Sequence, residues 1–493
     1  MRKFIELNKK AIFIAFALLF LLLDIQYSVL QYTKAPIDGD FANIVLPDEN
    51  YKQVLKDPMG INMLVNQEKY PSTNRFTAHF VMKSYFDNVP FWFQKIVSPI
   101  ESLYASITLS KLIIHLGFLS ILGFYLASFF GFSWKKFLLF LVLVSPFLIV
   151  SGQYRGNIGF IDTAVTYSFF YTLPLIPLLL LYFPIYKTIL TNKALKYPLL
   201  YVSFLIPALF LLVFFGPLTA PLIVLINAFI LLFYLIENKK KHFQLNLFSL
   251  IVLTLRNFNR AILLIVFLGS VLSLYSLYIG SFNSENNFCE LSISERYQAL
   301  PIGMLQTFLS IDLGALLWVL FIIINLYIIH KQKVVGAPTI LKLAFYFLLF
   351  ALSYCLLLPL GGCRTYRPFI LRSDTFVPIL VGLLFLLILS SYVVLNHLKN
   401  TSFKIYLFFF AFCSLYFMFS DKLPRDTNAN EKKALHYLAT KAAQGKRKIT
   451  LPIDCTVLSW TLFSEYEQSK NASYLLYKLN ILKRPTVFKN KMP

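Results

Sequence analysis

The sequence predicts an all-α polytopic membrane protein with about eleven transmembrane helices. Hydrophobic residues make up 58% of its 493 residues and charged residues only 14%, against about 45–50% and 25% in soluble domains. Apolar runs of about 20 residues, the length that crosses a bilayer, recur along the whole chain. This composition excludes a soluble globular enzyme, a disordered protein and a disulfide-framework peptide.

Eleven apolar runs are the predicted spans. They cover residues 11–30, 106–129, 136–151, 164–186, 196–215, 217–236, 261–280, 308–329, 339–360, 374–396 and 403–420. The first run follows a basic N-terminus but lacks a small-x-small cleavage site, so we expect it to remain as an anchor. Gly216-Pro217 separates the fifth and sixth runs and predicts a tight turn.

The basic residues predict the orientation in the membrane. With the N-terminus in the cytoplasm, most short cytoplasmic connections carry Lys or Arg, and Lys239-Lys240-Lys241 is the densest group. The outer connections 152–163 and 281–307 hold one cation each, whereas 361–373 holds three arginines. The net charge of +23 is therefore assigned to topology, with the lipid bilayer as partner and no nucleic acid. We expect a multi-pass protein of the bacterial inner (cytoplasmic) membrane.

The chain divides into four regions. These are the cytoplasmic N-terminus with the first span (1–30), an outer, periplasmic loop with interfacial helices (31–105), a bundle of about ten helices (106–420) and an outer α/β tail (421–493). In the tail, Asn430 is expected to cap a helix over 431–443, followed by a strand over 448–453 and a helix over 471–479. A unit of this size builds little independent core, so we expect it to dock on the membrane domain.

An acidic pair follows the first span by about eight residues. In Asp38-Gly39-Asp40, two carboxylates flank a glycine just outside the membrane. They are candidates for a general base or for ligands of a metal, and Gly39 permits a close approach. A plain turn is the alternative, because Asp and Gly are turn residues in any solvated loop.

The connection 361–373, which is predicted to lie on the outer side of the membrane, is rich in arginine. Arg364, Arg367 and Arg372 accompany Tyr366 in the connection after the ninth span. A guanidinium presents a planar fork of donors that matches phosphate oxygens, so these arginines are candidate ligands of a lipid phosphate. Snorkelling to lipid headgroups is the alternative interpretation.

A second outer connection holds one cation and one anion. Arg155 is a further candidate for phosphate binding, and Asp162 lies at the mouth of the fourth span. The two residues also fit a structural pair. Asp162, His79 and Tyr366 are candidate substrate contacts, although a lone histidine such as His79 is more often a packing residue. Three cysteines in polar segments allow a disulfide that the sequence does not assign: Cys289, Cys363 and Cys455.

Together, the acidic motif and the architecture resemble the GT-C superfamily of membrane glycosyltransferases, which includes protein mannosyltransferases and the aminoarabinose transferase acting on lipid A. The resemblance implies a sugar donor linked to polyprenyl phosphate or diphosphate. It also implies that Asp38 or Asp40 acts as base or metal ligand, and it leaves a divalent metal, Mg²⁺ or Mn²⁺, open. Arg155, Arg364, Arg367 and Arg372 match no motif of the superfamily.

We therefore expect transfer of a sugar to an envelope glycan, lipid or protein acceptor at the outer face of the membrane, as in polysaccharide biosynthesis. Two other classes stay open. A transporter of lipid-linked sugars requires ionisable groups near mid-membrane. A non-catalytic component of an envelope assembly requires no carboxylate, and replacement of Asp38 and Asp40 by Asn distinguishes it from the enzyme.

Overall fold

The computed structural model describes residues 2–149, 159–191, 193, 195, 198–288, 291–309, 313–361, 371, 373–420 and 427–491. Within these residues, nine helices are long and apolar enough to cross a membrane. They are Ala11–Tyr32, Pro99–Phe129, Val165–Thr191, Thr219–Lys241, Arg260–Ser281, Leu313–Lys331, Ala337–Gly361, Asp374–His397 and Asn400–Ser420. The prediction of a helical, multi-pass membrane protein is confirmed.

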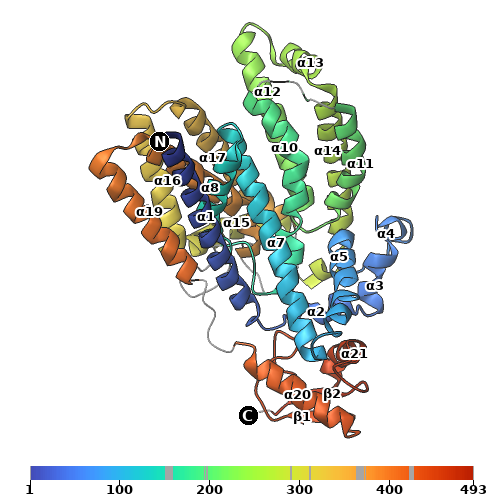
Figure 1. The fold of residues 1–493 in the computed structure, drawn as a ribbon. Coiled ribbons are helices and arrows are strands. Elements are labelled where there is room, and N and C mark those ends of the chain that lie inside the picture. The colour runs from blue at the N-terminus through green and yellow to red at the C-terminus, as the bar shows by residue number, and fades with distance from the viewer. Residues whose placement is uncertain are drawn as a thin grey trace.

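The long helices form two groups with α7 between them (Figure 1). One group contains α1 (Arg2–Tyr32), α16 (Leu313–Lys331), α17 (Ala337–Leu357), α18 (Val377–His397) and α19 (Asn400–Ser420). The other contains α10 (Leu175–Thr191), α11 (Pro198–Val213), α12 (Thr219–Lys241) and α14 (Arg260–Ser281). Helix α7 (Pro99–Phe129) packs against both α1 and α10 and therefore joins the groups.

Two of the eleven predicted spans correspond to shorter helices. The run 136–151 forms α8 (Trp134–Val144), which has 11 residues, and the run 196–215 forms α11, which has 16. Helix α8 stops before the single turn η1 (Ser145–Phe147). Pro146 in this turn has no N–H group with which to continue the helix. Nine of the eleven predicted spans are thus present at full length in the described chain.

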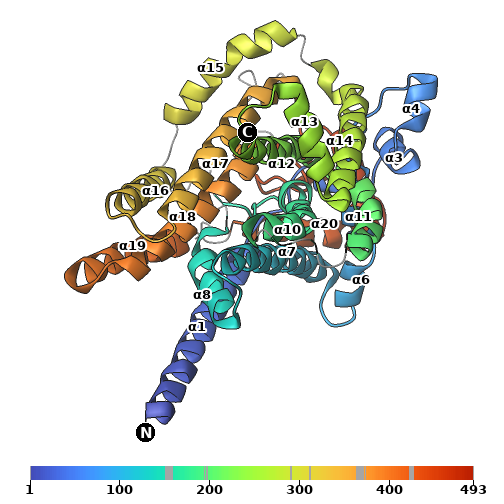
Figure 2. The same cartoon turned by 90° about the horizontal axis from the view of Figure 1, so that it is seen from above.

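Two further helices occupy segments that the sequence assigned to connections. Helix α13 (Leu247–Asn257) follows α12, and α15 (Ile293–Leu309) lies at the rim of the bundle between α14 and α16 (Figure 2). Short turns complete the membrane part: α9 (Val165–Tyr167), η2 (Ser168–Thr172), η3 (Ser284–Phe288), η4 (Leu358–Gly361) and η5 (Ser373–Phe376).

The first loop is helical along most of its length. It contains α2 (Phe41–Val45), α3 (Glu49–Lys56), α4 (Ile61–Asn66), α5 (Phe76–Phe86) and α6 (Val89–Phe93). Helix α7 then begins at Pro99, earlier than the predicted span. The Ser98 hydroxyl accepts a hydrogen bond from the Glu101 backbone nitrogen at 3.3 Å, and proline suits the first helical position. The added turns carry α7 toward the C-terminal tail.

The tail lies at the opposite end of the bundle from the N-terminus (Figure 1). It contains α20 (Ala429–Ala443), β1 (Lys448–Leu451), η6 (Glu467–Ser469), α21 (Lys470–Lys478) and β2 (Val487–Asn490). Strands β1 and β2 are parallel, with Lys448 opposite Val487. Asn428, two residues before the predicted cap, precedes α20. Leu438, Leu475 and Phe488 are fully buried, and they belong to the same apolar core as the bundle.

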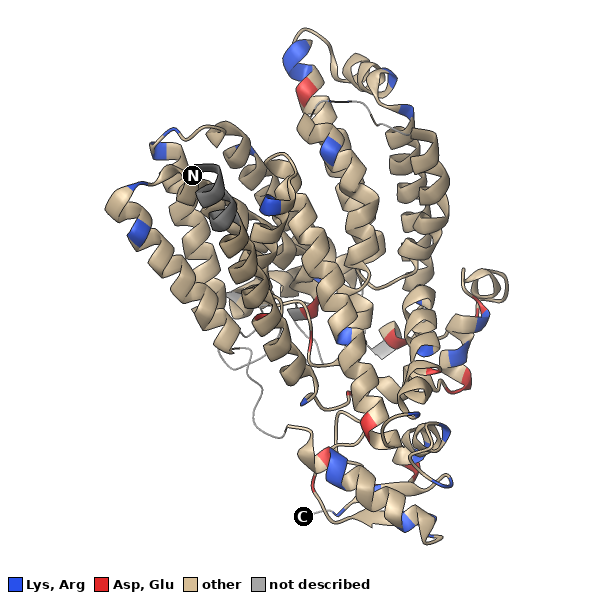
Figure 3. Ribbon diagram, viewed as in Figure 1, with Lys and Arg blue, Asp and Glu red and all other residues tan. Residues whose placement is uncertain are grey.

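Charged residues are distributed unequally between the two ends of the bundle (Figure 3). Lys and Arg predominate at the helix ends far from the tail, where Lys239, Lys240 and Lys241 form the last turn of α12. Acidic residues gather mainly in the half of the molecule that is nearer the tail. Few charged residues lie in the middle of the bundle, as expected for helices surrounded by lipid.

Candidate functional site

The segment after α1 buries the first acidic residue of the motif. Asp38 Oδ1 accepts hydrogen bonds from the Thr166 hydroxyl at 2.6 Å and from the Asp40 backbone nitrogen at 3.2 Å. Oδ2 accepts one from the Thr166 backbone nitrogen at 3.0 Å. Burial raises the pKa of Asp38, and the bonds from Thr166 oppose that rise. Asp38 therefore ties the loop after α1 to the beginning of α9.

A lysine on α7 brings positive charge to the same place. The Lys111 side chain is 1% exposed, and its Nζ donates to the Thr163 carbonyl oxygen. Its ammonium is attracted electrostatically by Asp38 and Asp162. A charge inside a membrane-spanning helix costs ~2.5–3.5 kcal/mol even on the lenient scale, so such groups are found beside partners.

Asp162 completes the arrangement from the loop before α9. It accepts hydrogen bonds from the Ala164 backbone nitrogen at 2.8 Å and from the Thr163 hydroxyl at 3.4 Å. Burial raises the pKa of Asp162, Lys111 lowers it, and the negative charge of Asp374 raises it further. We call Asp38, Lys111 and Asp374, which are buried, together with the half-buried Asp162, the buried charge cluster.

The second acidic residue of the motif has different neighbours. Asp40 is half-buried and precedes α2. Its charge acts on Tyr51 of α3, whose hydroxyl donates to Glu285 Oε1 at 3.1 Å. Burial raises the pKa of Tyr51 most, and the negative charge of Glu285 raises it further. Asp38 is thus fixed against α9, whereas Asp40 acts on α3 and is the more exposed of the two carboxylates.

His79 lies on α5, one helical turn from Arg75. Its side chain is 2% exposed, and neither ring nitrogen has a hydrogen-bond partner. The imidazole edge packs on the Phe170 ring, with 5.1 Å between centroids. Burial and the charge of Arg75 lower the pKa of His79 to about 3, against the opposing effect of Glu285. The imidazole is therefore neutral at pH 7.

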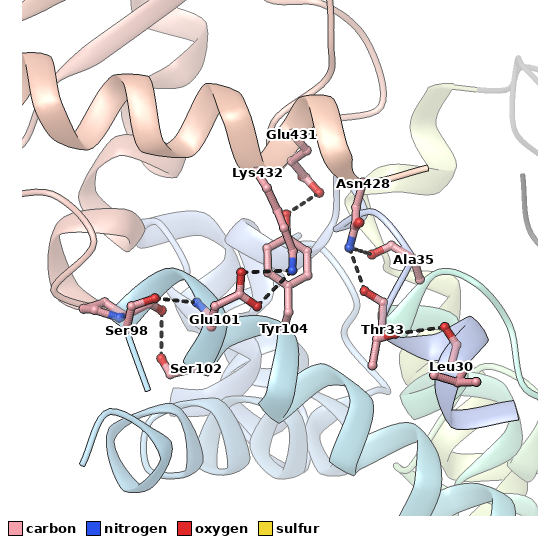
Figure 4. A network of polar contacts seen from close by, with 11 residues as sticks. Leu30, Thr33, Ala35, Ser98, Glu101, Ser102, Tyr104, Asn428, Glu431 and Lys432 are labelled. Atoms are coloured by element: carbon pink, nitrogen blue, oxygen red, sulfur yellow. Dashed lines mark hydrogen bonds and ion pairs between the residues drawn. The ribbon is translucent and has the colours of Figure 1, made fainter. Parts of the chain in front are cut away.

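The tail contacts the segment 33–40, which contains the acidic motif and which we call the acidic loop (Figure 4). The Asn428 side-chain nitrogen donates to the carbonyl oxygens of Thr33, at 2.9 Å, and Ala35, at 3.3 Å. Glu431 Oε2 accepts hydrogen bonds from the Ile37 backbone nitrogen at 3.1 Å and the Tyr104 hydroxyl at 2.8 Å. Burial raises the pKa of Glu431 to about 7. The backbone just before Asp38 is therefore positioned by the tail.

The glycine of the acidic motif is required by a contact with the tail. A Cβ atom at Gly39 would lie closer than 3.0 Å to the backbone nitrogen and the indole ring of Trp460. The sequence indicated that Gly39 permits a close approach, and the group that approaches is this distant part of the chain.

Five predicted site residues lie outside the described residues, namely Arg155, Arg364, Tyr366, Arg367 and Arg372. The same holds for Cys289 and Cys363, while Cys455 is described as a free, half-buried thiol. Among the described residues, no group of three or more His, Cys, Asp or Glu side chains is arranged to hold a metal ion. The metal alternative for Asp38 and Asp40 stays a prediction.

Comparison of the chain with protein-family models, with curated proteins and with solved structures finds no match. The structure defines the class of protein: a helical multi-pass membrane protein with a buried charge cluster beneath a docked tail. Any finer assignment depends on the chemistry of that cluster.

Three residues that build the site were not among the predicted site residues. Lys111 is a single cation in a long apolar run, and an ionisable residue inside a span is a usable signal of function. Glu431 and Trp460 meet the acidic loop only through folding, from a tail about 400 residues away in the chain. No local pattern marks either of them.

Proposed function

We propose that the chain is a membrane glycosyltransferase of the GT-C type. It transfers a sugar from a polyprenyl-phosphate donor to an acceptor at the outer face of the bacterial inner membrane. The observation that carries the proposal is the buried charge cluster beside Asp40. Buried carboxylates with a lysine partner are costly in a membrane protein and mark functional sites.

The two aspartates take different roles in this proposal. Both oxygens of Asp38 already accept hydrogen bonds, so Asp38 is a positioning residue that orients the Asp40 backbone. Asp40, which is more exposed, is the general base. It accepts the proton of an acceptor hydroxyl while that oxygen forms a bond to the anomeric carbon of the sugar. The bond from that carbon to the phosphate oxygen breaks, and the polyprenyl phosphate departs with the electron pair.

The departing phosphate requires positive charge. Arg155, Arg364, Arg367 and Arg372 remain the proposed ligands of the lipid phosphate, on the grounds of their side-chain chemistry. In sequence, Arg372 precedes Asp374 of the buried charge cluster by two residues. Lys111 acts within the cluster, where it favours the ionised forms of Asp38 and Asp162.

The distribution of charge supports an outer location for the site. Lys and Arg predominate at the helix ends far from the tail, which the positive-inside rule assigns to the cytoplasm. The tail and the acidic loop then lie on the other side, where lipid-linked donors and envelope acceptors meet.

The experiment is sugar transfer by the purified protein from radiolabelled polyprenyl-phosphate sugars. Asp40→Asn is expected to lower the rate by about 10²–10⁴-fold, the range for loss of a general base. Asp48→Asn is the matched control, because Asp48 is exposed in the same loop and caps α3, a role that Asn also performs. Equal rates for Asp40→Asn and wild type contradict the proposal.

A transporter of lipid-linked sugars is the second candidate, and one observation favours it. Asp24 lies within the first span, is 1% exposed and accepts a hydrogen bond from the Ser145 hydroxyl. An acidic group at this depth is typical of ion-coupled transport. Movement of a labelled lipid-linked sugar across vesicles, abolished by Asp24→Asn and retained in Asp40→Asn, identifies a transporter instead of a transferase.

A further inference from the structure

We infer that Trp460 and Tyr167 form an aromatic platform for a sugar ring of the acceptor, so that the acceptor is a glycan. The inference rests on the proposed function and specifies its acceptor. It concerns a residue of the tail, and it makes the tail part of the substrate-binding site rather than a cap.

The position of Trp460 is fixed by the acidic motif. Its backbone nitrogen and one edge of its indole lie on Gly39, between Asp38 and Asp40, so closely that no side chain fits at position 39. Even so, 54% of the Trp460 surface is exposed. The tail therefore presents a large aromatic surface directly beside the proposed base. This apolar surface stays in contact with solvent, which is unfavourable unless a ligand covers it.

A second ring continues this surface from the membrane part. The Tyr167 ring lies 5.8 Å from the Trp460 ring, centroid to centroid, at an angle of 33°. Tyr167 follows Thr166, whose hydroxyl and backbone nitrogen hold Asp38. Tyr171 supports Tyr167 from one helical turn further on, edge to face, at 5.7 Å. The two rings of the platform are thus built on the same contacts that position the acidic pair.

This combination suits a pyranose. One face of such a ring is lined with C–H groups and packs on an aromatic surface, while the hydroxyls at its rim require hydrogen-bond acceptors. Trp460 and Tyr167 supply the surface, and Asp40 supplies an acceptor next to it. An acceptor sugar seated there would offer both a C–H face to the two rings and a hydroxyl to the base, whereas an alkyl lipid tail offers no hydroxyl.

The other exposed tryptophans provide the contrast. Trp92 is 64% exposed on α6, and Trp134 is 70% exposed at the beginning of α8. Among the described contacts, neither touches the acidic motif, and both fit the aromatic belt that membrane proteins place at the lipid interface. Trp134→Ala is therefore a matched control.

The test is binding of lipid-free trisaccharides, namely maltotriose, chitotriose and mannotriose, to the full-length protein in nanodiscs, followed by saturation-transfer NMR. We expect at least one trisaccharide to bind to the wild type. Trp460→Leu, which keeps an apolar side chain over Gly39, is expected to weaken binding roughly 10-fold. Trp460→Phe, which keeps a ring, is expected to remain within about threefold of wild type, as is Trp134→Ala.

The outcomes separate this inference from the proposed function, because binding is measured without donor. Binding that survives in Asp40→Asn and depends on Trp460 supports the platform even when no transfer is found. Absence of trisaccharide binding to the wild type, or equal binding by Trp460→Leu and Trp134→Ala, overturns the platform while transfer activity and its dependence on Asp40 stand.

Discussion

Two sets of buried polar groups in the described part of the chain differ in charge. Inside the bundle, Asn325 of α16 donates to the hydroxyls of Ser390 and Ser391, both at 3.0 Å, and accepts from the Tyr406 hydroxyl at 2.7 Å. Every bond joins neutral groups, and they link α16 to α18 and α19. Such contacts hold helices together in a membrane at little cost.

Asn227 of α12 repeats this arrangement in the other helix group. It donates to the Val266 carbonyl and the Ser270 hydroxyl, both at 3.0 Å, and accepts from the Tyr182 hydroxyl at 2.8 Å. The same amide–tyrosine pattern thus joins α12 to α14 and α10. In both helix groups an asparagine side chain on one helix bonds uncharged groups on two neighbouring helices.

The buried charge cluster departs from this pattern. It holds Asp38, Lys111 and Asp162, and burial disfavours the ionised form of both acids. The same fold joins its helices elsewhere through neutral amides, so the cluster bears an electrostatic cost that those contacts avoid. This difference supports a structural role for the neutral contacts and motivates the proposal that the charged cluster serves chemistry.

The largest expected effect comes from removing the cation. Lys111→Met keeps the length of the side chain but removes the positive charge that favours the ionised forms of Asp38 and Asp162. A charge left uncompensated in a membrane-spanning segment costs about 2.5–3.5 kcal/mol. We expect this loss in the free energy of unfolding, together with loss of transfer. Unchanged stability would remove Lys111 from the cluster.

The tail contact is expected to depend on pH. Burial raises the pKa of Glu431 from 4.5 to about 7, so the folded state binds the proton more tightly than the unfolded state. Stability is therefore full below about pH 4.5 and falls as pH rises through about 7, by about 3 kcal/mol. Amide hydrogen exchange in residues 429–491, followed as a function of pH, measures this loss of stability. Glu431→Gln should remove the pH dependence, and a slope that persists in this variant contradicts the assignment.

A smaller effect is expected from the hydroxyl that holds Asp38. Thr166→Val removes one hydrogen bond to a carboxylate, worth about 1.5–3 kcal/mol. Because the hydrogen bond from the Thr166 hydroxyl lowers the pKa of Asp38, its loss raises that pKa. The acid limb of the pH–rate profile should therefore move to higher pH. A profile that keeps its position while only stability falls would make Asp38 merely structural.

The smallest effect is expected in the neutral contacts. Asn325→Leu removes the bonds that Asn325 donates to two serines and the bond that it accepts from a tyrosine, at a cost of about 1–2 kcal/mol in a membrane. Thermal unfolding should record that loss, while transfer per folded molecule stays within about twofold of wild type. Asn227→Leu is the matched variant in the other helix group, and a large loss of transfer in either variant breaks the comparison.

Most membrane-spanning helices could be predicted from the sequence, because a span is recognised from the apolar residues within it. It misplaced α8 by extending an apolar run across Pro146, and it missed α15, in which polar residues and Pro301 obscure the helical pattern. Both errors concern short or interrupted helices, in which composition is a weak guide.

The candidate site was only partly predictable. Asp38 and Asp40 stand out because two acids follow the first span within about ten residues, and Asp162 because it lies just before another span. Trp460 and Glu431 approach from the far end of the chain, so their role depends on the docking of the tail. Contacts of such long separation in sequence leave no mark in local composition.

The most direct measurement compares two variants in one assay. Transfer from radiolabelled polyprenyl-phosphate sugars is measured for Asp40→Asn and Asn325→Leu at equal amounts of folded protein. If charge marks the chemistry, Asp40→Asn falls at least about 100-fold and Asn325→Leu stays near wild type. Transfer that is equal in both variants, or absent from the wild type with every donor, contradicts the account.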